Sequence, residues 1–144
     1  HAYNTGDPAY YNNTLIGSCD FSIQGGSVDA AFISITNFSI VPNNGNLTGE
    51  EYNIWAGDNV TKLGETIAQS EGYITSTNAN VNADGIYYTD MGEATYLSAF
   101  GDSGGPVYLT DSKKVIGIHK GSTAFTSIFV KVDNIASKLN AHFN

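Results

Sequence analysis

Short apolar runs separated by polar turns follow one another along most of the chain. These runs predict strands over residues 15–23, 29–35, 86–89, 107–109, 115–119 and 127–131, with a looser alternation at 51–56 and 67–75. Stretches rich in Gly, Asn and Asp predict turns or loops at 42–49 and 78–85. Many short strands of this kind are typical of an all-β barrel or sandwich.

The last segment of the chain has a different period. Its apolar residues lie three or four positions apart, which is the spacing of one helix face: Val132, Ile135, Ala136, Leu139 and Phe143. Asp133 stands near the start of this pattern as a candidate helix cap. We therefore expect one helix at the end of an otherwise all-β chain.

Charge and cysteine content exclude several classes of function. The 144 residues suffice for one domain, and 14 acidic residues against six lysines and no arginine give a net charge of −8. Nucleic acids and anionic membrane surfaces are disfavoured as partners, because both require clustered positive charge. No apolar run is long enough to span a bilayer.

Cys19 is the only cysteine, so we expect a buried apolar residue rather than a disulfide or zinc site. No motif indicates a metal or cofactor.

One glycine-rich string has the properties that a nucleophilic serine needs, namely Gly101-Asp102-Ser103-Gly104-Gly105-Pro106. A serine hydroxyl attacks a carbonyl only when a base removes its proton, and the intermediate needs N–H donors aimed at its oxyanion. Glycines permit the tight turn that aims such donors, because they accept positive φ freely. The string therefore predicts Ser103 as a nucleophile rather than as part of an ordinary turn.

This string resembles the nucleophile signature of the trypsin-like, chymotrypsin-fold serine proteases. Further segments resemble the same family: the strand at 115–121, the strand and helix at 127–143, the strand entrance at 28–33, and His1-Ala2. The resemblance implies a chymotrypsin-like double antiparallel β-barrel with a C-terminal helix. It implies that the first barrel is incomplete, with its remainder at about 1–65 and the second barrel with the helix at about 66–144 of a single peptidase domain.

The same resemblance implies a catalytic triad in the family order His, Asp, Ser. His1 would be the general base, Asp29 would orient its imidazole, and Ser103 would attack the substrate. The backbone N–H groups of Gly101 and Ser103 would form the oxyanion hole. If His1 is this base, the family's first strands would precede it. We then expect little peptidase activity from the 144-residue chain and much more from a version extended upstream.

Other residues of the right types were weighed for these roles. His119 follows the nucleophile, in the wrong order for the family's base, and His142 lies at the helix end, where a cation is ordinary. Asp7 and Asp20 are alternative acids. Asp29 is favoured because it stands just before an apolar strand that could bury and orient its carboxylate. The sequence leaves the partner of Asp102 open.

The resemblance also points to a specificity pocket lined by Leu97, Ser98, His119, Gly121 and Ser122. Leu97 stands where a trypsin-like pocket carries an Asp, so cleavage after Lys or Arg is not expected. A histidine with a hydroxyl neighbour resembles the glutamyl endopeptidases, which implies a preference for Glu, or Gln, at the cleaved position. The plainer alternative is a histidine whose nitrogens bond to the backbone.

These features predict an extracellular serine endopeptidase that acts on a peptide or protein through an acyl-enzyme. The alternative is a non-catalytic protease homologue that serves as a binding or adhesion module. An α/β-hydrolase also carries Gly-x-Ser-x-Gly, but there the serine is followed by a helix, whereas a predicted hairpin follows Ser103.

Overall fold

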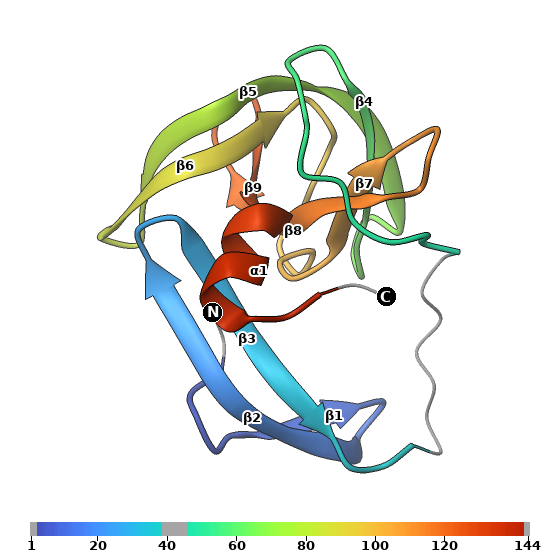
Figure 1. The fold of residues 1–144 in the computed structure, drawn as a ribbon, viewed down its shortest axis with the longest axis vertical. Helices are drawn as coiled ribbons and strands as arrows, with labels where there is room; N and C mark the ends of the chain where they lie inside the picture. The colour runs from blue at the N-terminus through green and yellow to red at the C-terminus, as the bar shows by residue number, and fades with distance from the viewer. Residues whose placement is uncertain (1–2, 39–45, 143–144) are drawn as a thin grey trace.

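The chain forms two β-structures and one helix. A computed structural model describes residues 3–38 and 46–142. In these residues a three-stranded sheet is followed by a closed six-stranded barrel and a C-terminal helix (Figure 1). The elements are β1 (Pro8–Tyr11), β2 (Thr14–Gly25), β3 (Val28–Ile35), β4 (Asn59–Leu63), β5 (Gln69–Ala83), β6 (Ile86–Ala94), β7 (Pro106–Leu109), β8 (Val115–Ser122), β9 (Ser127–Lys131) and α1 (Val132–Leu139).

The N-terminal sheet has the order β1-β2-β3, with antiparallel neighbours. β2 turns into β3 at Gly25 and Gly26, whose φ angles of 113° and 62° suit glycine. The tip of this hairpin is fixed to the barrel, because the Gly26 N–H donates to the Tyr87 carbonyl at 3.3 Å and the Thr89 N–H donates to the Gly26 carbonyl at 2.8 Å. Asp29 therefore stands beside the barrel, close to the fixed tip.

The barrel has the strand order β4-β5-β6-β9-β8-β7 and closes because β4 also pairs with β7. Its interior is filled by a cluster of buried side chains that includes Val60, Ile74 and Phe129. Gly92 and Gly117 both face the ring of Phe129, and a Cβ on either would collide with it. The two glycines therefore make room for Phe129, the side chain that β9 contributes to this cluster.

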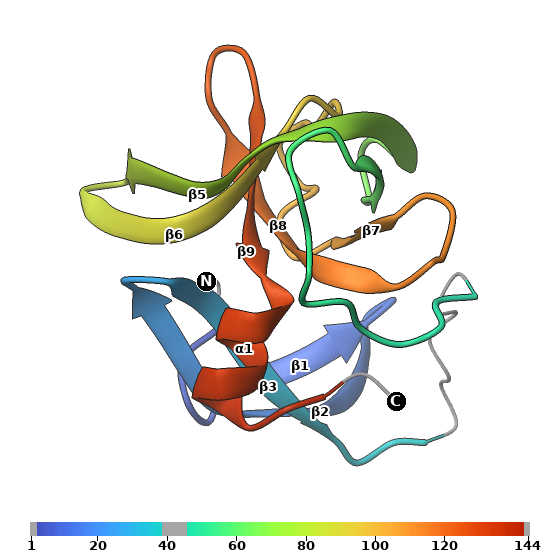
Figure 2. The same ribbon diagram turned by 45° about the horizontal axis from the view of Figure 1, so that its top comes forward.

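A second cluster joins the sheet to the barrel. Val28 of β3 packs with Met91 of β6, Val130 of β9 and Ile135 of α1. Figure 2 shows α1 lying between the N-terminal sheet and the barrel. This helix has eight residues, and no helix of the described chain is long and apolar enough to cross a membrane.

The expected all-β architecture with a terminal helix is confirmed. β1 and β4 were not predicted, and residues 51–56 form no strand. The expected loop at 78–85 was also mostly wrong. β5 continues to Ala83 through several register shifts, and the turn comes only at Asp84 and Gly85. The barrel begins at Asn59, before the boundary expected near residue 65, because β4 pairs with β5 and β7.

The expected cap of the helix is absent. The N-cap is Lys131, which makes no side-chain capping bond, and the Asp133 carboxylate instead accepts from the next residue's N–H at 2.8 Å. Phe143 lies outside the described residues, as do residues 42–45 of the loop expected at 42–49, and residues 46–49 form no strand.

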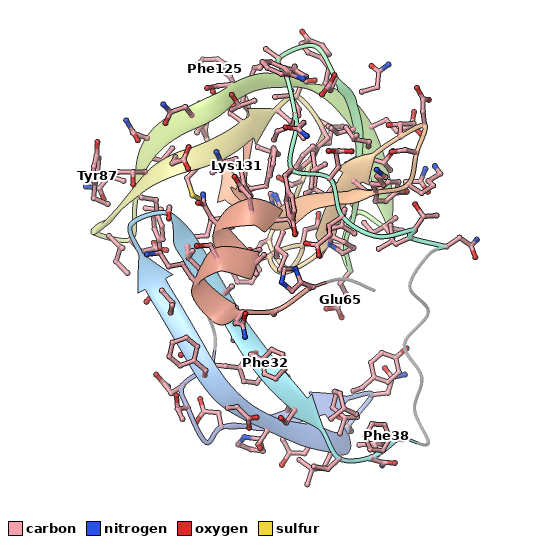
Figure 3. The ribbon with its side chains drawn as sticks, viewed as in Figure 1. Phe32, Phe38, Glu65, Tyr87, Phe125 and Lys131 are labelled. Atoms are coloured by element: carbon pink, nitrogen blue, oxygen red, sulfur yellow. The ribbon has the colours of Figure 1, made fainter. Side chains whose placement is uncertain are left out.

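Several aromatic side chains lie on the surface, away from the two cores. Phe32 and Phe38 belong to the N-terminal sheet and the segment after it, whereas Tyr87 and Phe125 lie at turns of the barrel (Figure 3). Cys19 is buried in the sheet, where its Sγ lies 3.5 Å from the Phe21 carbonyl oxygen. The described structure therefore gives this thiol the packing role expected of it.

Candidate active site

Ser103 lies in the loop between β6 and β7, and this loop is fastened to β8. The Gly104 N–H donates to the His119 carbonyl at 2.9 Å, and the His119 N–H donates to the Gly105 carbonyl at 2.8 Å. Gly101 and Gly104 have φ angles of 101° and 93°, so the turn needs glycine at both positions. Ser103 is exposed, and its Oγ donates to the Lys120 carbonyl at 3.0 Å.

Asp102 has a partner that the sequence did not reveal. Its Oδ2 lies 2.6 Å from Nζ of Lys62, and both side chains are fully buried. The backbone N–H groups of Thr66, Ile67 and Ala99 also donate to this carboxylate, at 2.8, 3.0 and 2.9 Å. Burial opposes ionisation, but Lys62 and the three N–H donors outweigh it and hold the pKa of Asp102 well below its ordinary value. An internal ammonium therefore anchors the loop that carries Ser103.

The two N–H groups expected to form an oxyanion hole belong to the same anchored loop. Among the described residues, neither the Gly101 N–H nor the Ser103 N–H donates a hydrogen bond. Behind them, Gly105 packs against the carbonyl of Leu63 at the end of β4, so closely that a Cβ would collide with it. The loop thus leaves two N–H groups beside Ser103 while its other side rests on the barrel.

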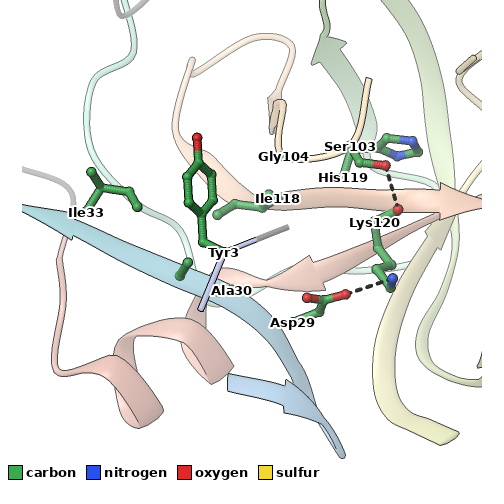
Figure 4. Close-up of a pocket in the computed structure, with 10 residues that line it drawn as sticks. Tyr3, Asp29, Ala30, Ile33, Ser103, Gly104, Ile118, His119 and Lys120 are labelled. Carbon is green, nitrogen blue, oxygen red and sulfur yellow. Dashed lines mark hydrogen bonds and ion pairs between the residues drawn. The ribbon is translucent and has the colours of Figure 1, made fainter. Parts of the chain in front are cut away.

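Asp29 and Ser103 line the same cavity, of about 250 Å³, between β3 and the barrel (Figure 4). Asp29 is 5% exposed, and its Oδ2 lies 2.7 Å from Nζ of Lys120. The Tyr88 hydroxyl donates to the same oxygen at 3.3 Å. The structure thus places the expected carboxylate and hydroxyl on two sides of one cavity.

The alternative carboxylates lie elsewhere. Asp7 accepts from the Asn4 N–H at 2.7 Å in a surface turn, and exposed Asp20 accepts from the Ser34 hydroxyl. Neither lines the cavity that holds Ser103. The geometry therefore favours Asp29 among the three aspartates that were considered.

The expected base, His1, lies outside the described residues. Tyr3, two positions later, lines the cavity. Of the other two histidines, His142 lies with its Nδ1 3.0 Å from Glu50 Oε1 and 3.3 Å from the Tyr52 hydroxyl, away from this cavity. His119 does line the cavity, from β8.

His119 is held as a neutral imidazole. It is 2% exposed, and its Nδ1 lies 3.0 Å from the hydroxyl of the buried Tyr96. Burial, and then the positive charge of Lys62, lower the pKa of His119 to about 4. At neutral pH the ring is therefore uncharged, and Tyr96 occupies one of its two nitrogens.

The remaining pocket residues are only partly brought together. Ser98 Oγ lies 2.9 Å from Ser127 Oγ, which donates to the Tyr96 carbonyl at 2.8 Å, so Ser98 is linked to the support of His119 rather than to His119 itself. Leu97 is 69% exposed. Gly121 and Ser122 line a second cavity, of about 500 Å³, together with Lys120.

Sequence reasoning missed three residues of this site, namely Lys62, Tyr96 and Lys120. Lys62 follows two buried residues of β4, and Lys120 stands in β8, where most of the other positions are buried. In a chain with only six lysines, a lysine within such a strand was a signal that a buried carboxylate would lie nearby. Tyr96 follows the end of β6, and no local pattern linked it to His119.

Comparison with known proteins bears on the fold and on part of the sequence. No protein-family model matches the chain. The curated protein glutamyl endopeptidase 2 of Streptomyces griseus is 39% identical over 72 residues, which are 49% of this chain and 37% of that relative. The match thus spans little more than a third of the relative's length.

Solved structures match over nearly the whole chain. Nocardiopsis protease superposes with a TM-score of 0.81 at 20% identity, covering 95% of this chain and 78% of that one. Cellulomonas bogoriensis chymotrypsin gives a TM-score of 0.77 at 22% identity over 95% and 78%. The chain has the chymotrypsin-like fold. A glutamic acid-specific serine protease, described as using a histidine triad in substrate binding, shares this fold with a TM-score of 0.78 at 23% identity over 97% and 80%.

Within the chymotrypsin-like fold of this chain, the candidate site draws on both β-structures. β3 of the N-terminal sheet contributes Asp29, whereas the barrel contributes Ser103, His119 and Lys120. The site's geometry therefore depends on how the sheet is seated on the barrel.

Proposed function

We propose that the chain is a serine endopeptidase that hydrolyses peptide bonds through an acyl-enzyme on Ser103. One observation carries this proposal: Ser103, on an anchored glycine turn, shares a cavity with the buried carboxylate of Asp29. The serine proteases that share its fold, and the curated relative named as an endopeptidase, support the reaction class. Secretion to the extracellular space is part of the proposal.

In the proposed reaction, Ser103 Oγ leaves the Lys120 carbonyl and attacks the carbonyl carbon of the substrate. His1 accepts the hydroxyl proton, and Asp29 orients its imidazole and stabilises the imidazolium. The N–H groups of Gly101 and Ser103 stabilise the oxyanion. The C–N bond then breaks, the proton passes to the departing amine, and water hydrolyses the ester that remains.

A fluorophosphonate probe tests this function, because it labels only an activated serine. In protein extended upstream of His1, we expect the wild type to be labelled at Ser103, S103A to remain unlabelled, and S112A to label as the wild type does. Ser112 is an exposed serine at the turn between β7 and β8, so it provides a matched hydroxyl deletion. Absence of labelling in folded wild-type protein would contradict the proposal and favour a binding module.

We further propose that His119 selects Glu, or Gln, at the cleaved position. The neutral ring lines the cavity beside Ser103, with Tyr96 at Nδ1, so Nε2 can donate to a carboxylate or amide oxygen. The curated relative is named a glutamyl endopeptidase, and one protein of the same fold is described as specific for glutamic acid. That protein is described as using a histidine triad in substrate binding, whereas the side chain bonded to Nδ1 of His119 in this chain is Tyr96.

Peptides that differ only at the cleaved residue test this preference. We expect H119Q to lose about 100-fold in kcat/KM for Glu and Gln peptides. H142Q, which removes the histidine bound to Glu50, should keep the wild-type values. Since the pKa of His119 is about 4, the wild-type ratio of Glu to Gln cleavage should stay constant from about pH 6 to 8. Efficient cleavage after Lys or large aromatic residues, with none after Glu, would overturn the preference.

A further inference from the structure

Lys120 contacts both residues of the proposed machinery that the structure describes. Its Nζ lies 2.7 Å from Asp29 Oδ2, and its backbone carbonyl accepts the hydrogen bond of Ser103 Oγ at 3.0 Å. Figure 4 shows Lys120 between Ser103 on one side and Asp29 on the other. One residue of β8 thus touches the nucleophile through its main chain and the carboxylate through its side chain.

The Lys120 ammonium is enclosed rather than loosely placed. Its side chain is 8% exposed, and Nζ lies 5.0 Å from the centre of the Tyr88 ring, within the range of a cation–π contact. The Tyr88 hydroxyl reaches the same Asp29 oxygen as Lys120 does. The ring and the carboxylate together fix where this positive charge lies.

Lys120 is therefore a cation and not a second base for Ser103. Burial alone would lower its pKa, but the hydrogen bond and the negative charge of Asp29 outweigh burial and raise the pKa of Lys120 above its ordinary value. A lysine that acts as a base must be neutral at the working pH. The ammonium acts instead on the carboxylate.

We propose that Lys120 is a positioning residue that fixes the Asp29 carboxylate and partly offsets its charge, so that the general base titrates at lower pH. This inference rests on the proposed function. A carboxylate beside an imidazole raises the imidazole's pKa, and an ammonium on the same carboxylate opposes that effect. The wild-type enzyme would thereby keep an unprotonated base in mildly acidic solution.

Other polar and charged groups lie near this pair on neighbouring elements, including Gln24 of β2, which pairs with Asp29 in the sheet. Tyr88 comes from β6, and neutral His119 precedes Lys120 on β8. Asp84, at the turn between β5 and β6, lines a cavity together with Lys120. The Lys62–Asp102 pair lies behind His119 and brings both signs of charge. Lys120 is the cation in direct contact with Asp29 among these described groups.

The test uses protein extended upstream of His1 and measures the rate at which a fluorophosphonate labels Ser103 as a function of pH. The acid limb of this profile is the pH range over which the labelling rate rises as the base loses its proton. In K120M it should move upward by about half a pH unit or more, because the Lys120 ammonium no longer offsets the charge of Asp29. K120R, which keeps the charge, should retain the wild-type limb. K114M removes the same charge from a surface pair with Glu51 and should leave the limb in place.

The possible outcomes separate this inference from the proposed function. Labelled wild type with an unchanged acid limb in K120M overturns the role of Lys120 alone. Wild type that is folded and never labelled overturns the proposed function and this inference together. If K120M is unstable, K120Q takes its place, because its amide can still donate to Asp29 without a charge and should show the same upward shift.

Discussion

At the scale of single residues, two lysine–aspartate pairs flank Ser103. Lys62 with Asp102 fixes the loop behind Ser103, and Lys120 with Asp29 lies across the cavity in front of it. Both pairs are almost wholly buried, so each attraction is opposed by the cost of removing two charges from water. Stability should therefore change most when one partner is removed and the other charge stays buried without a counter-charge.

We predict that K62M lowers the free energy of unfolding by about 3–5 kcal/mol, because it leaves the Asp102 carboxylate buried without its ammonium. K62R should lose less, since it keeps the charge. K114M breaks a pair in which the lysine is 44% exposed, so it should lose less than about 1 kcal/mol. Urea denaturation monitored by fluorescence measures all three. Equal loss in K62M and K114M would show that the buried pair does not hold the loop.

The free energy of unfolding in the same series should also depend on pH. The pKa of Asp102 is lower in the folded protein than its ordinary value of 3.8. As pH falls below about 4, the unfolded chain therefore binds this proton first, and the wild-type free energy of unfolding decreases. Above that pH the contribution is fully present. K62M removes the main favourable partner, so its stability should respond less to acid over this range.

At the scale of elements, one aromatic side chain of the barrel interior contacts the strands on both sides of its own. Phe129 of β9 fills the interior, and Gly92 of β6 and Gly117 of β8 leave space for it. Because β9 lies between β6 and β8, the ring covers the inner face of both neighbouring strands at their glycines. β8 also carries His119 and Lys120, so the packing of this ring reaches the candidate site.

We predict that G92A destabilises the fold by about 1–3 kcal/mol, because the added methyl group overlaps the Phe129 ring. F129L introduced with G92A should recover part of this loss by freeing space. The matched control is G121A, since a Cβ at Gly121 would meet nothing within 4 Å. Thermal unfolding compares the variants, and a G92A protein as stable as G121A would contradict this account of the barrel interior.

The strands that were predictable from sequence are those whose apolar runs are continuous or strongly alternating. β9 and the start of α1 lie where the pattern placed them. β1 and β4 were missed because both are short. β1 has four residues and begins with a proline, and β4 carries polar residues whose role becomes clear only from the pairing. β5 runs further than expected, because the polar segment still pairs with β6 although the register of that pairing shifts several times.

The residues of the site likewise divide into those that a local pattern indicates and those that only the fold brings together. The turn around Ser103 is a local motif, and Asp29 was favoured because it stands before an apolar strand, so both could be proposed from sequence. Lys62 meets Asp102 across 40 positions, and Lys120 meets Asp29 across the gap between the two β-structures. Contacts of this kind depend on how the barrel closes and where the sheet rests, which no local pattern records.

At the scale of the whole molecule, one apolar core spans the sheet, the barrel and the helix. Val28 and Ala30 come from the sheet, Met91 and Val130 from the barrel, and Ile135 from α1. Asp29 lies between two of these core residues in β3, so the packing that joins the two β-structures also sets the position of the carboxylate. Stability and the geometry of the candidate site are thus coupled through the same side chains.

The position of α1 has a consequence for shortened versions of the chain. This helix packs on β3, β8 and β9. A version cut before Val132 loses the element that seats the β2–β3 hairpin on the barrel. Removing α1 should therefore loosen the contact that places Asp29 opposite Ser103, although neither residue belongs to the helix.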